Sequence, residues 1–473
     1  MIDLQKLDLK QLSKLHIHFI GIGGAGMSGI ARIMLAKSIE VSGSDKNPSQ
    51  MTLALKALGA QIYIGHDSKN VEGADLVVVS AAIAKNNPEY EAAIAAGIPI
   101  AARATALSWL LSESKSVAVA GTHGKTTTTA MLTVALQAAG VDPSFAIGGT
   151  INSAGTNAHS GSGEVFVVEA DESDGSFLAY KPKGAIITNI ELDHVDHFTS
   201  ENQLFQTFAN FIRTIKAGGF LIACGDDPGV KKLIEMNSEV DLKIITYGQG
   251  PDNDYQISRV NLNPNGSTAQ ITINGRKAGE LSLVVPGLHN LLNALAAFAA
   301  GCALSVNEER LIQGLSSFTG TKRRFELKGE INGVKVIDDY GHHPTEIKVT
   351  LTAAKNLAGN GRVLTIFQPH RYSRTAAFAH EFAQSLELSD YVYLLEIYAA
   401  SEQPMDGVSS LLISKLMRSD KVKFEPSMLQ VVNDVTAIAK PGDVIIILGA
   451  GDVTSLCVPI LDTLAAKSSN SEV

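Results

Sequence analysis

Cysteine is scarce in this chain of 473 residues, which has only three, at positions 224, 302 and 457. Their odd number and wide spacing provide neither a disulfide framework nor a CxxC metal site, and they fit a reducing compartment. Long apolar runs are also lacking, because the most apolar helical stretch, residues 291–304, is too short to span a bilayer. Residues 1–14 mix charges with leucine and lack the apolar centre of a secretory signal. We therefore expect a cytoplasmic protein without membrane insertion.

An excess of basic charge is also absent, since 39 Lys and Arg residues face 48 Asp and Glu residues and the net charge is −9. This balance argues against non-specific nucleic-acid binding, so we expect no nucleic-acid partner. Hydrophobic residues make up 45% and charged residues 18%, as in ordinary globular proteins. The length exceeds that of one compact domain and predicts about two or three domains. No short-period repeat or long low-complexity linker separates them.

The pattern of apolar strands and amphipathic helices divides the chain into α/β segments. In the first, strand-like stretches at 16–22, 40–44 and 76–80 alternate with helical stretches such as 27–37. Alternation of this kind predicts a parallel sheet covered by helices. We assign residues 1–112 to a Rossmann-like domain.

A second alternating series occupies residues 113–324. Its expected strands are 116–120, 165–169, 185–189 and 219–224. Residues 255–285 then alternate in polarity and contain Asn-Pro-Asn-Gly and Asn-Gly turns, which predicts a small β insertion of antiparallel hairpins. A helix at 289–304 follows this insertion.

The third series, residues 325–473, is again α/β and Rossmann-like. The dipeptide Asn332-Gly333 predicts a hairpin turn. Expected strands lie at 334–338, 363–367, 391–395 and 444–448. The complete fold prediction is therefore three α/β domains, of which the central one contains a glycine-rich phosphate loop.

This loop follows the strand at 116–120 and opens the next helix. It consists of Gly121, Thr122, His123, Gly124, Lys125, Thr126 and Thr127. Backbone N–H groups at such a turn face an anion, so Lys125 would reach the β- and γ-phosphates of ATP and the Thr126 hydroxyl would bind Mg²⁺. The longer form of this motif has glycine at position 119, where this chain has Val119. The alternative is a glycine turn with an incidental lysine, and the flanking strand and helix disfavour it.

The short loop resembles that of the Mur ligase family, which includes folylpolyglutamate synthetase relatives. Further blocks resemble the family in order along essentially the whole chain: Glu169-Ala-Asp-Glu-Ser-Asp174, Asn189-Ile-Glu-Leu-Asp-His-Val-Asp196, His289-Asn-Leu-Leu-Asn293, Lys322-Arg-Arg-Phe325, Asp338-Asp-Tyr-Gly-His-His-Pro344 and Phe367-Gln-Pro-His-Arg-Tyr-Ser-Arg374. The last two are most similar to the member that adds L-alanine to UDP-N-acetylmuramate.

The resemblance implies an ATP-dependent, ADP-forming amide ligase of peptidoglycan precursor synthesis, with UDP-N-acetylmuramate and L-alanine as substrates and an acyl phosphate as intermediate. It also implies roles in cell-wall biogenesis, cell shape and cell division. The family member that attaches a whole tripeptide during recycling shares the three-domain plan and is the alternative within the family. Amino-acid selectivity stays open, and so does the choice between monomer and homodimer.

Acidic residues and histidines after the central strands are the expected metal ligands. Glu169 ends a predicted strand at the sheet edge where α/β proteins bind ligands. The resemblance implies that Glu169 binds Mg²⁺ and that His194 binds a second Mg²⁺. Alternatively, residues 169–174 form a solvated acidic loop, and residues 193–197 form a zinc site.

Further nucleotide contacts come from two other segments. The resemblance implies that Asn290 and Asn293 lie near the adenine, that Arg324 contacts the nucleotide and that Asp339 closes over the ribose. For Asn290 the alternative role is capping of the following helix. Because these residues belong to different segments, we expect the ATP site at a domain interface.

Two loops of the third segment are the expected amino-acid site. Tyr340 and His342 follow the strand at 334–338, and Arg371 and Arg374 follow the strand at 363–367, which places both loops at one sheet edge. A guanidinium suits a carboxylate, so we predict that both arginines clamp substrate, although a pair of surface arginines is the alternative. His342 would orient the amine. The predicted catalytic set is Lys125, Glu169, His194, His342, Arg371 and Arg374.

The N-terminal glycine loop matches G-x-G-x-x-G after a strand and by itself favours an NAD-dependent dehydrogenase. It comprises Gly21, Gly23, Gly24, Ala25 and Gly26, and Asp45 ends the next strand. That reading leaves the second phosphate loop and the third segment unexplained. In the resembled family the first domain holds the UDP end of the substrate. We therefore assign the loop to the diphosphate and Asp45 to the uridine region, or to a simple turn. A third class, an inactive nucleotide-binding module, is disfavoured by the intact Lys125, Thr126 and Glu169.

Overall fold

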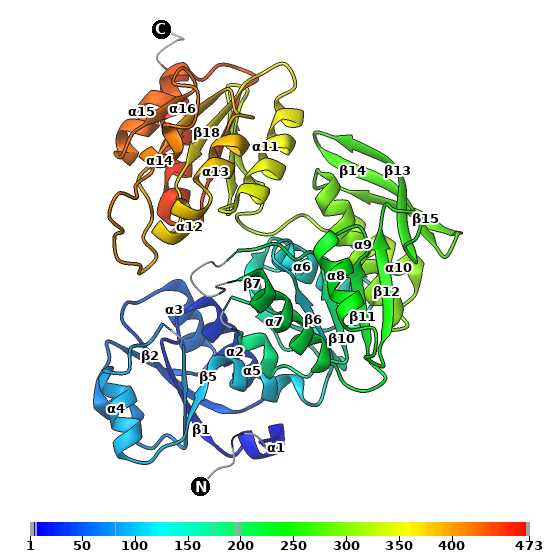
Figure 1. Cartoon of the computed structure of the whole chain (residues 1–473). Helices are drawn as coiled ribbons and strands as arrows, with labels where there is room; N and C mark the ends of the chain where they lie inside the picture. The colour runs from blue at the N-terminus through cyan, green and yellow to red at the C-terminus, as the bar shows by residue number, and fades with distance from the viewer. Residues whose placement is uncertain are drawn as a thin grey trace.

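The computed structural model describes residues 7–80, 82–173, 175–193 and 200–469, together with Leu4 and Phe198. It contains three sheets that follow one another along the chain, each covered by helices. Figure 1 shows the N-terminal domain in blue, the central domain from cyan to green and the C-terminal domain from yellow to red. The prediction of three α/β domains is confirmed.

The N-terminal domain has a parallel five-stranded sheet in the order β3-β2-β1-β4-β5. Its strands are β1 (His16–Ile20), β2 (Glu40–Asp45), β3 (Gln61–Ile64), β4 (Leu76–Val79) and β5 (Ile100–Ala102). Its helices are α1 (Leu9–Leu12), α2 (Ala25–Ala36), α3 (Gln50–Ala57), the 3₁₀ helix η1 (Ser68–Val71), α4 (Pro88–Ala95) and α5 (Arg103–Leu111). The chain leaves β1 at the centre of the sheet, where the strand order reverses, so the first glycine loop lies at the usual ligand position of such sheets.

The central domain has a ten-stranded sheet in the order β15-β14-β13-β12-β11-β10-β6-β9-β7-β8. Its strands are β6 (Lys115–Ala120), β7 (Ser144–Ile151), β8 (Thr156–His159), β9 (Val165–Glu169), β10 (Gly184–Ile187), β11 (Phe220–Cys224), β12 (Lys243–Gly248), β13 (Tyr255–Asn263), β14 (Gly266–Ile273) and β15 (Arg276–Leu283). Its helices are α6 (Lys125–Ala138), η2 (Ser176–Ala179), α7 (Glu201–Arg213), α8 (Pro228–Met236), α9 (Leu288–Ala303) and α10 (Glu308–Ser316).

The predicted hairpins β13 to β15 are antiparallel, and they extend this sheet because β13 pairs with β12. In the interior of the sheet's parallel part, β6 lies between β9 and β10. The four residues from Val117 to Ala120 are completely buried, as the apolar run predicts. The phosphate loop therefore emerges from the middle of a rigid sheet.

The C-terminal domain has a six-stranded sheet in the order β16-β17-β21-β18-β19-β20. Its strands are β16 (Glu326–Ile331), β17 (Val334–Asp339), β18 (Val363–Phe367), β19 (Tyr391–Leu394), β20 (Val422–Phe424) and β21 (Val444–Leu448). Its helices are α11 (Pro344–Ala358), α12 (Tyr372–Ala377), α13 (Ala379–Leu386), α14 (Leu411–Ser414), α15 (Met428–Ile438), η3 (Asp452–Leu456) and α16 (Cys457–Ser469). The Asn332-Gly333 turn joins the antiparallel pair β16 and β17, as predicted.

The first two domains share one apolar core, whereas the third has its own. A single cluster of buried side chains extends from Leu12 to Phe318, and α2 packs against β7 and β8. The C-terminal domain has separate clusters on the two faces of its sheet. Contacts between the C-terminal and central domains include polar pairs, such as Arg374 with Asp193 and His123 with Glu346. None of the described helices is long and apolar enough to cross a membrane.

Candidate active site

The phosphate loop has the tight backbone that its two glycines permit. Gly121 and Gly124 have φ values of 125° and 84°, which other residues rarely adopt. A Cβ atom at Gly121 would lie 2.1 Å from Thr188 Oγ1, and one at Gly124 would lie 2.8 Å from Asn293 Oδ1. Helix α6 begins at the next residue, Lys125, so its free N–H groups face the loop.

Lys125 is surrounded by oxygen atoms. Its Nζ donates to the backbone oxygens of Gly121 and Thr122, at 2.8 and 3.1 Å, and to both carboxylate oxygens of Glu172, at 3.0 and 2.9 Å. Burial disfavours the charged ammonium, but Glu172 and Asp171 outweigh that effect and raise the pKa of Lys125. Lys125 is therefore held as a cation at the loop. Glu172 was absent from the predicted site, although it belongs to the acidic block that the sequence singled out.

Thr126 and Glu169 lie side by side, as the sequence predicts for a metal site. Thr126 Oγ1 donates to Glu169 Oε1 at 2.9 Å, and the backbone N–H of Gly148 donates to Glu169 Oε2 at 2.7 Å. Hydroxyl and carboxylate oxygens beside a phosphate loop are ligands that Mg²⁺ prefers, so these residues fit that ion. The other predicted ligand, His194, lies outside the described residues, as do Asp196 and His197 of the zinc alternative.

A cavity of about 610 Å³ next to the phosphate loop collects the predicted nucleotide residues. Its lining includes His123, Gly124, Thr127, Asn290, Asn293, Arg324 and Asp339. The capping alternative for Asn290 is wrong, because Gly287 is the N-cap of α9 and the Asn290 side chain donates to Pro286 O at 2.7 Å. The domain-interface position of this cavity agrees with the prediction, since its walls come from the central and C-terminal domains.

Asp339 and Arg324 also make contacts where the chain enters the C-terminal domain. The Asp339 carboxylate accepts from the backbone N–H groups of Phe325 and Gly341, at 2.7 and 2.8 Å. Arg324 Nη1 lies 3.6 Å from Glu346 Oε1. Both predicted residues therefore have protein partners at the edge of the cavity.

A second cavity, of about 710 Å³, lies between the phosphate loop and the C-terminal sheet. It is lined by Lys125, Thr126 and Glu169 from one side and by Tyr340, His342, Arg371 and Arg374 from the other. Strands β17 and β18 flank β21 in parallel, which places the loops after them at one edge, as predicted. Asp193 and His370 also line this cavity and are among the lining residues that the sequence did not predict.

The histidines of this second cavity are electrically neutral. Burial lowers the pKa of His342 to about 4 and that of His370 to about 3. The rings lie with their centroids 5.7 Å apart. His342 Nδ1 donates to Tyr340 O at 3.1 Å, so its Nε2 can accept a hydrogen bond, whereas His370 Nδ1 already accepts from Arg374 Nη1 at 3.2 Å.

The two predicted clamp arginines differ in their surroundings. Arg371 has a φ of 72°, an uncommon conformation for a residue other than glycine, and such strain clusters at functional sites. Arg374 is buried, and its Nε and Nη2 lie 2.9 and 2.8 Å from Asp193 Oδ1. Arg374 therefore has an acidic partner from the central domain, and its role as a substrate clamp stays a prediction.

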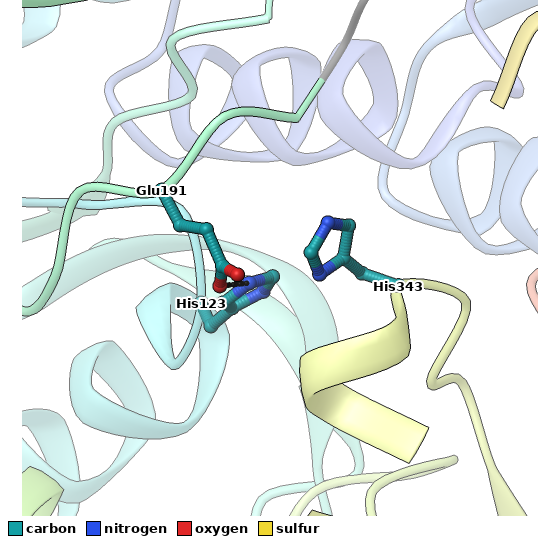
Figure 2. Close-up of side chains that lie close together, drawn as sticks. All are labelled: His123, Glu191 and His343. Atoms are coloured by element: carbon teal, nitrogen blue, oxygen red, sulfur yellow. Dashed lines mark hydrogen bonds and ion pairs between the residues drawn. The ribbon is translucent and has the colours of Figure 1, made fainter. Parts of the chain in front are cut away.

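A cluster of His123, Glu191 and His343 joins the phosphate loop to the C-terminal domain (Figure 2). Its ligand-type atoms lie within 4.8 Å of one another. His123 Nε2 lies 3.1 Å from Glu191, and His123 Nδ1 lies 3.3 Å from Glu346. Burial opposes protonation of His123, but these two carboxylates outweigh it and raise its pKa to about 9. Without a metal ion the ring is thus an imidazolium, and each of its nitrogens faces a carboxylate.

The N-terminal glycine loop is held by Asp45. Asp45 Oδ2 accepts from the Gly23 N–H at 2.9 Å, and a Cβ atom at Gly23 would lie 2.8 Å from the same oxygen. A cavity of about 110 Å³ connects this domain with the central one, and its lining includes Gly26, Arg103 and Glu169. Gly26 of the first glycine loop and Glu169, the predicted metal ligand, therefore line one cavity, although they are 143 positions apart in sequence.

Three α/β domains arranged around a phosphate loop, with a polar cavity at the domain junction, define a multidomain nucleotide-binding enzyme. Family models match all three parts: "Mur ligase family, catalytic domain" at residues 16–115, "Mur ligase middle domain" at 119–301 and "Mur ligase, glutamate ligase domain" at 323–451. The chain belongs to the Mur ligase family.

Full-length relatives agree with this assignment. The chain is 47% identical to a UDP-N-acetylmuramate-L-alanine ligase of Renibacterium salmoninarum, with 96% of each chain covered. It is 46% identical to an enzyme of the same name from Saccharopolyspora erythraea, covering 96% of this chain and 94% of that one. Among solved structures, a UDP-N-acetylmuramate-alanine ligase from Thermotoga maritima matches with a TM-score of 0.81 and 30% identity, covering 96% of this chain and 100% of that one. A murein peptide ligase from Psychrobacter arcticus matches with a TM-score of 0.70 and 27% identity, covering 95% and 99%.

Proposed function

We propose that this chain ligates L-alanine to the lactyl carboxylate of UDP-N-acetylmuramate in peptidoglycan precursor synthesis, in the cytoplasm. ATP is cleaved to ADP and phosphate. The observation that carries the proposal is the 710 Å³ cavity, where Lys125, Thr126 and Glu169 face His342 and Arg371. A phosphate-transfer site and a carboxylate-binding site are thereby brought together. The relatives that bear this activity in their names cover nearly the whole chain.

The reaction has two steps. First, a carboxylate oxygen attacks the γ-phosphorus of ATP, ADP leaves and an acyl phosphate forms. Second, the unprotonated amine of L-alanine attacks the acyl carbon, the amine loses a proton, and phosphate leaves from the tetrahedral intermediate. Such catalysis consists mostly of positioning and of stabilising oxygen anions.

The central domain supplies the groups for the first step. The loop from Gly121 to Thr127 cradles the phosphates and Lys125 contacts the β- and γ-phosphates. Thr126 and Glu169 would hold Mg²⁺, which would neutralise phosphate charge, and His194 would hold a second ion. Asn290 and Asn293 lie at the adenine, with Arg324 and Asp339 at the remainder of the nucleotide.

The other two domains hold the partners of the reaction. Gly21, Gly23, Gly24, Ala25 and Gly26 bind the UDP diphosphate, and Asp45 serves the uridine region by fixing this loop. Tyr340, His342, Arg371 and Arg374 bind the amino acid. Neutral His342 orients the incoming amine by accepting a hydrogen bond from it. The three domains span 1–112, 113–324 and 325–473.

The likeness to the murein peptide ligase, with its TM-score of 0.70, favours a second candidate, in which the same fold attaches a whole peptide. One assay separates the two. Purified chain is incubated with ATP, Mg²⁺ and UDP-N-acetylmuramate, and phosphate release is measured with single amino acids or with a tripeptide. We expect release with L-alanine. Release with the tripeptide alone would establish the recycling activity, and release with neither would refute both candidates.

A further inference from the structure

A buried carboxylate outside the predicted site faces the phosphate-loop lysine. The Glu172 side chain is 1% exposed, and both of its oxygens lie within 3.0 Å of Lys125 Nζ. Asp171 is 3.9 Å from the same ammonium, but its side chain is 46% exposed and therefore screened by water. Glu172 is thus the main counterion of Lys125 among the described residues.

The Lys125 ammonium uses its hydrogen bonds within the protein. It carries three N–H donors, and the oxygens of Glu172, Gly121 and Thr122 all lie within 3.1 Å. A phosphate that binds at the loop must therefore take the ammonium from one of these acceptors. The two backbone oxygens are neutral and belong to the loop itself. The Glu172 carboxylate is negatively charged, so it is the acceptor that competes with phosphate for the ammonium.

We propose that Glu172 is a positioning residue, which competes with phosphate oxygens for the Lys125 ammonium and so sets both nucleotide affinity and the place of the ammonium during phosphate transfer. This inference rests on the proposed use of ATP. It adds a residue that acts through Lys125 and does not itself touch the substrate. The competition from Glu172 weakens nucleotide binding, and in return the carboxylate holds the Lys125 ammonium in the place that phosphate transfer requires.

Protonation offers a way to move the lysine without leaving a buried charge behind. Burial, opposed by Lys125 and supported by Asp171, raises the pKa of Glu172 to about 7. Among the described residues, the charged groups that act on it are Lys125 from α6 and Asp171 from the same loop. When Lys125 turns to a phosphate, Glu172 takes a proton from the solvent buffer. A buried carboxylate without a partner is strongly destabilising, so this uptake makes the exchange reversible.

The decisive variant is Glu172→Gln, which keeps the side-chain volume and removes the charge. We expect ADP and ATP to bind several-fold more tightly by calorimetry, while kcat falls about tenfold or more because the ammonium is less well placed. A merely structural role predicts weaker binding together with lower kcat. Unchanged or weaker nucleotide binding would overturn the proposal.

A double-mutant cycle tests whether Glu172 acts through the lysine. In a Lys125→Met background, Glu172→Gln should no longer change nucleotide affinity, and a persisting effect would contradict the proposal. Calorimetry of wild type near pH 7, in buffers of different ionisation enthalpy, should show proton uptake on ADP binding, and Glu172→Gln should reduce it. Equal uptake in both proteins would also count against the proposal.

Two further variants serve as controls. Glu164→Gln removes a carboxylate from an exposed pair with Lys115 just before β9 and should leave both affinity and kcat unchanged. Glu172→Asp keeps the negative charge but places it farther from Lys125 Nζ, so its nucleotide affinity should lie between those of wild type and Glu172→Gln. If Glu172→Gln fails to fold, Glu172→Asp serves as the test variant. If the wild-type protein binds ATP but does not ligate L-alanine, the proposed function is refuted. The role of Glu172 is still tested in that case, because nucleotide affinities of wild type and variant can still be compared.

Discussion

Arg374 of the C-terminal domain and Asp193 of the central domain form a buried ion pair, with Nη2 and Oδ1 2.8 Å apart and exposed fractions of 3% and 5%. The C-terminal domain has its own apolar cores, so this pair is one of the polar contacts that hold it against the other two domains. Removing either partner leaves a charge in a poorly hydrated place. Arg374 therefore belongs both to the contact between the two domains and to the lining of the 710 Å³ cavity.

Arg374→Ala should affect both the domain contact and the amino-acid site. Loss of one partner of a buried pair costs roughly 3–5 kcal/mol, so the first transition in urea should move to lower concentration. The KM for the amino acid should rise or kcat should fall strongly. Small-angle scattering should show a more open molecule. If Arg374→Ala stays compact and its kinetics are unchanged, Arg374 is not part of the site. The double variant Arg374→Met with Asp193→Leu should recover stability but not activity, because it removes both charges together.

Lys125→Ala should abolish product formation while UDP-N-acetylmuramate still binds. The reason is spatial, because Lys125 opens α6 in the central domain whereas the other glycine loop precedes α2 in the N-terminal domain. Phosphate release measures the first effect and calorimetry with the UDP substrate measures the second. Loss of both would undermine the assignment of two separate binding sites.

The contact between His123 and Glu346 should weaken in alkali. The pKa of His123 rises from 6.5 to about 9 on folding, once its bonds to Glu191 and Glu346 have outweighed burial. Its contribution to stability is then fully present below pH 6.5 and disappears as pH rises through about 9. Melting temperatures measured from pH 6 to pH 10 should show this loss for wild type. His123→Asn should show a smaller dependence over that range, and parallel curves for the two proteins would contradict the prediction.

Glu89 should make the N-terminal domain sensitive to acid. It is completely buried, and its Oε2 and Oε1 accept from Ser44 Oγ and Asn70 Nδ2, both at 2.5 Å. Burial raises its pKa, but the nearby His18 ring, 3.8 Å away, and the hydrogen bonds from Ser44 and Asn70 outweigh burial and lower the pKa from 4.5 to about 2.

The stabilisation by Glu89 is therefore fully present above pH 4.5 and is lost as pH falls through about 2. Glu89→Gln should lower the free energy of unfolding at neutral pH, because the amide presents N–H donors to the donors around it. It should also flatten the acid limb of the stability curve. Glu91→Gln on the exposed side of the same helix is the matched control and should change neither quantity.

Much of the local structure followed from sequence because it depends on neighbours in the chain. The strands at 165–169, 363–367 and 444–448 have the predicted bounds. Short apolar runs rich in β-branched residues and flanked by turns favour buried strands over other local structures. The meeting of the loops after β17 and β18 was also predictable, because parallel strands end at one edge. For Asn290 the alternative of helix capping is wrong, because Gly287, three positions earlier, is the N-cap of α9.

The sequence by itself determined the three α/β domains and the glycine loop that opens α6, because strand periodicity and glycine turns are local properties. Only the tertiary structure decided which charges meet. Lys125 pairs with Glu172 across 47 positions and Arg374 with Asp193 across 181. Such partners are chosen by the packing of sheets and domains, and no spacing rule relates them. The physical reason is that a buried charge needs a partner in space, whatever its distance along the chain.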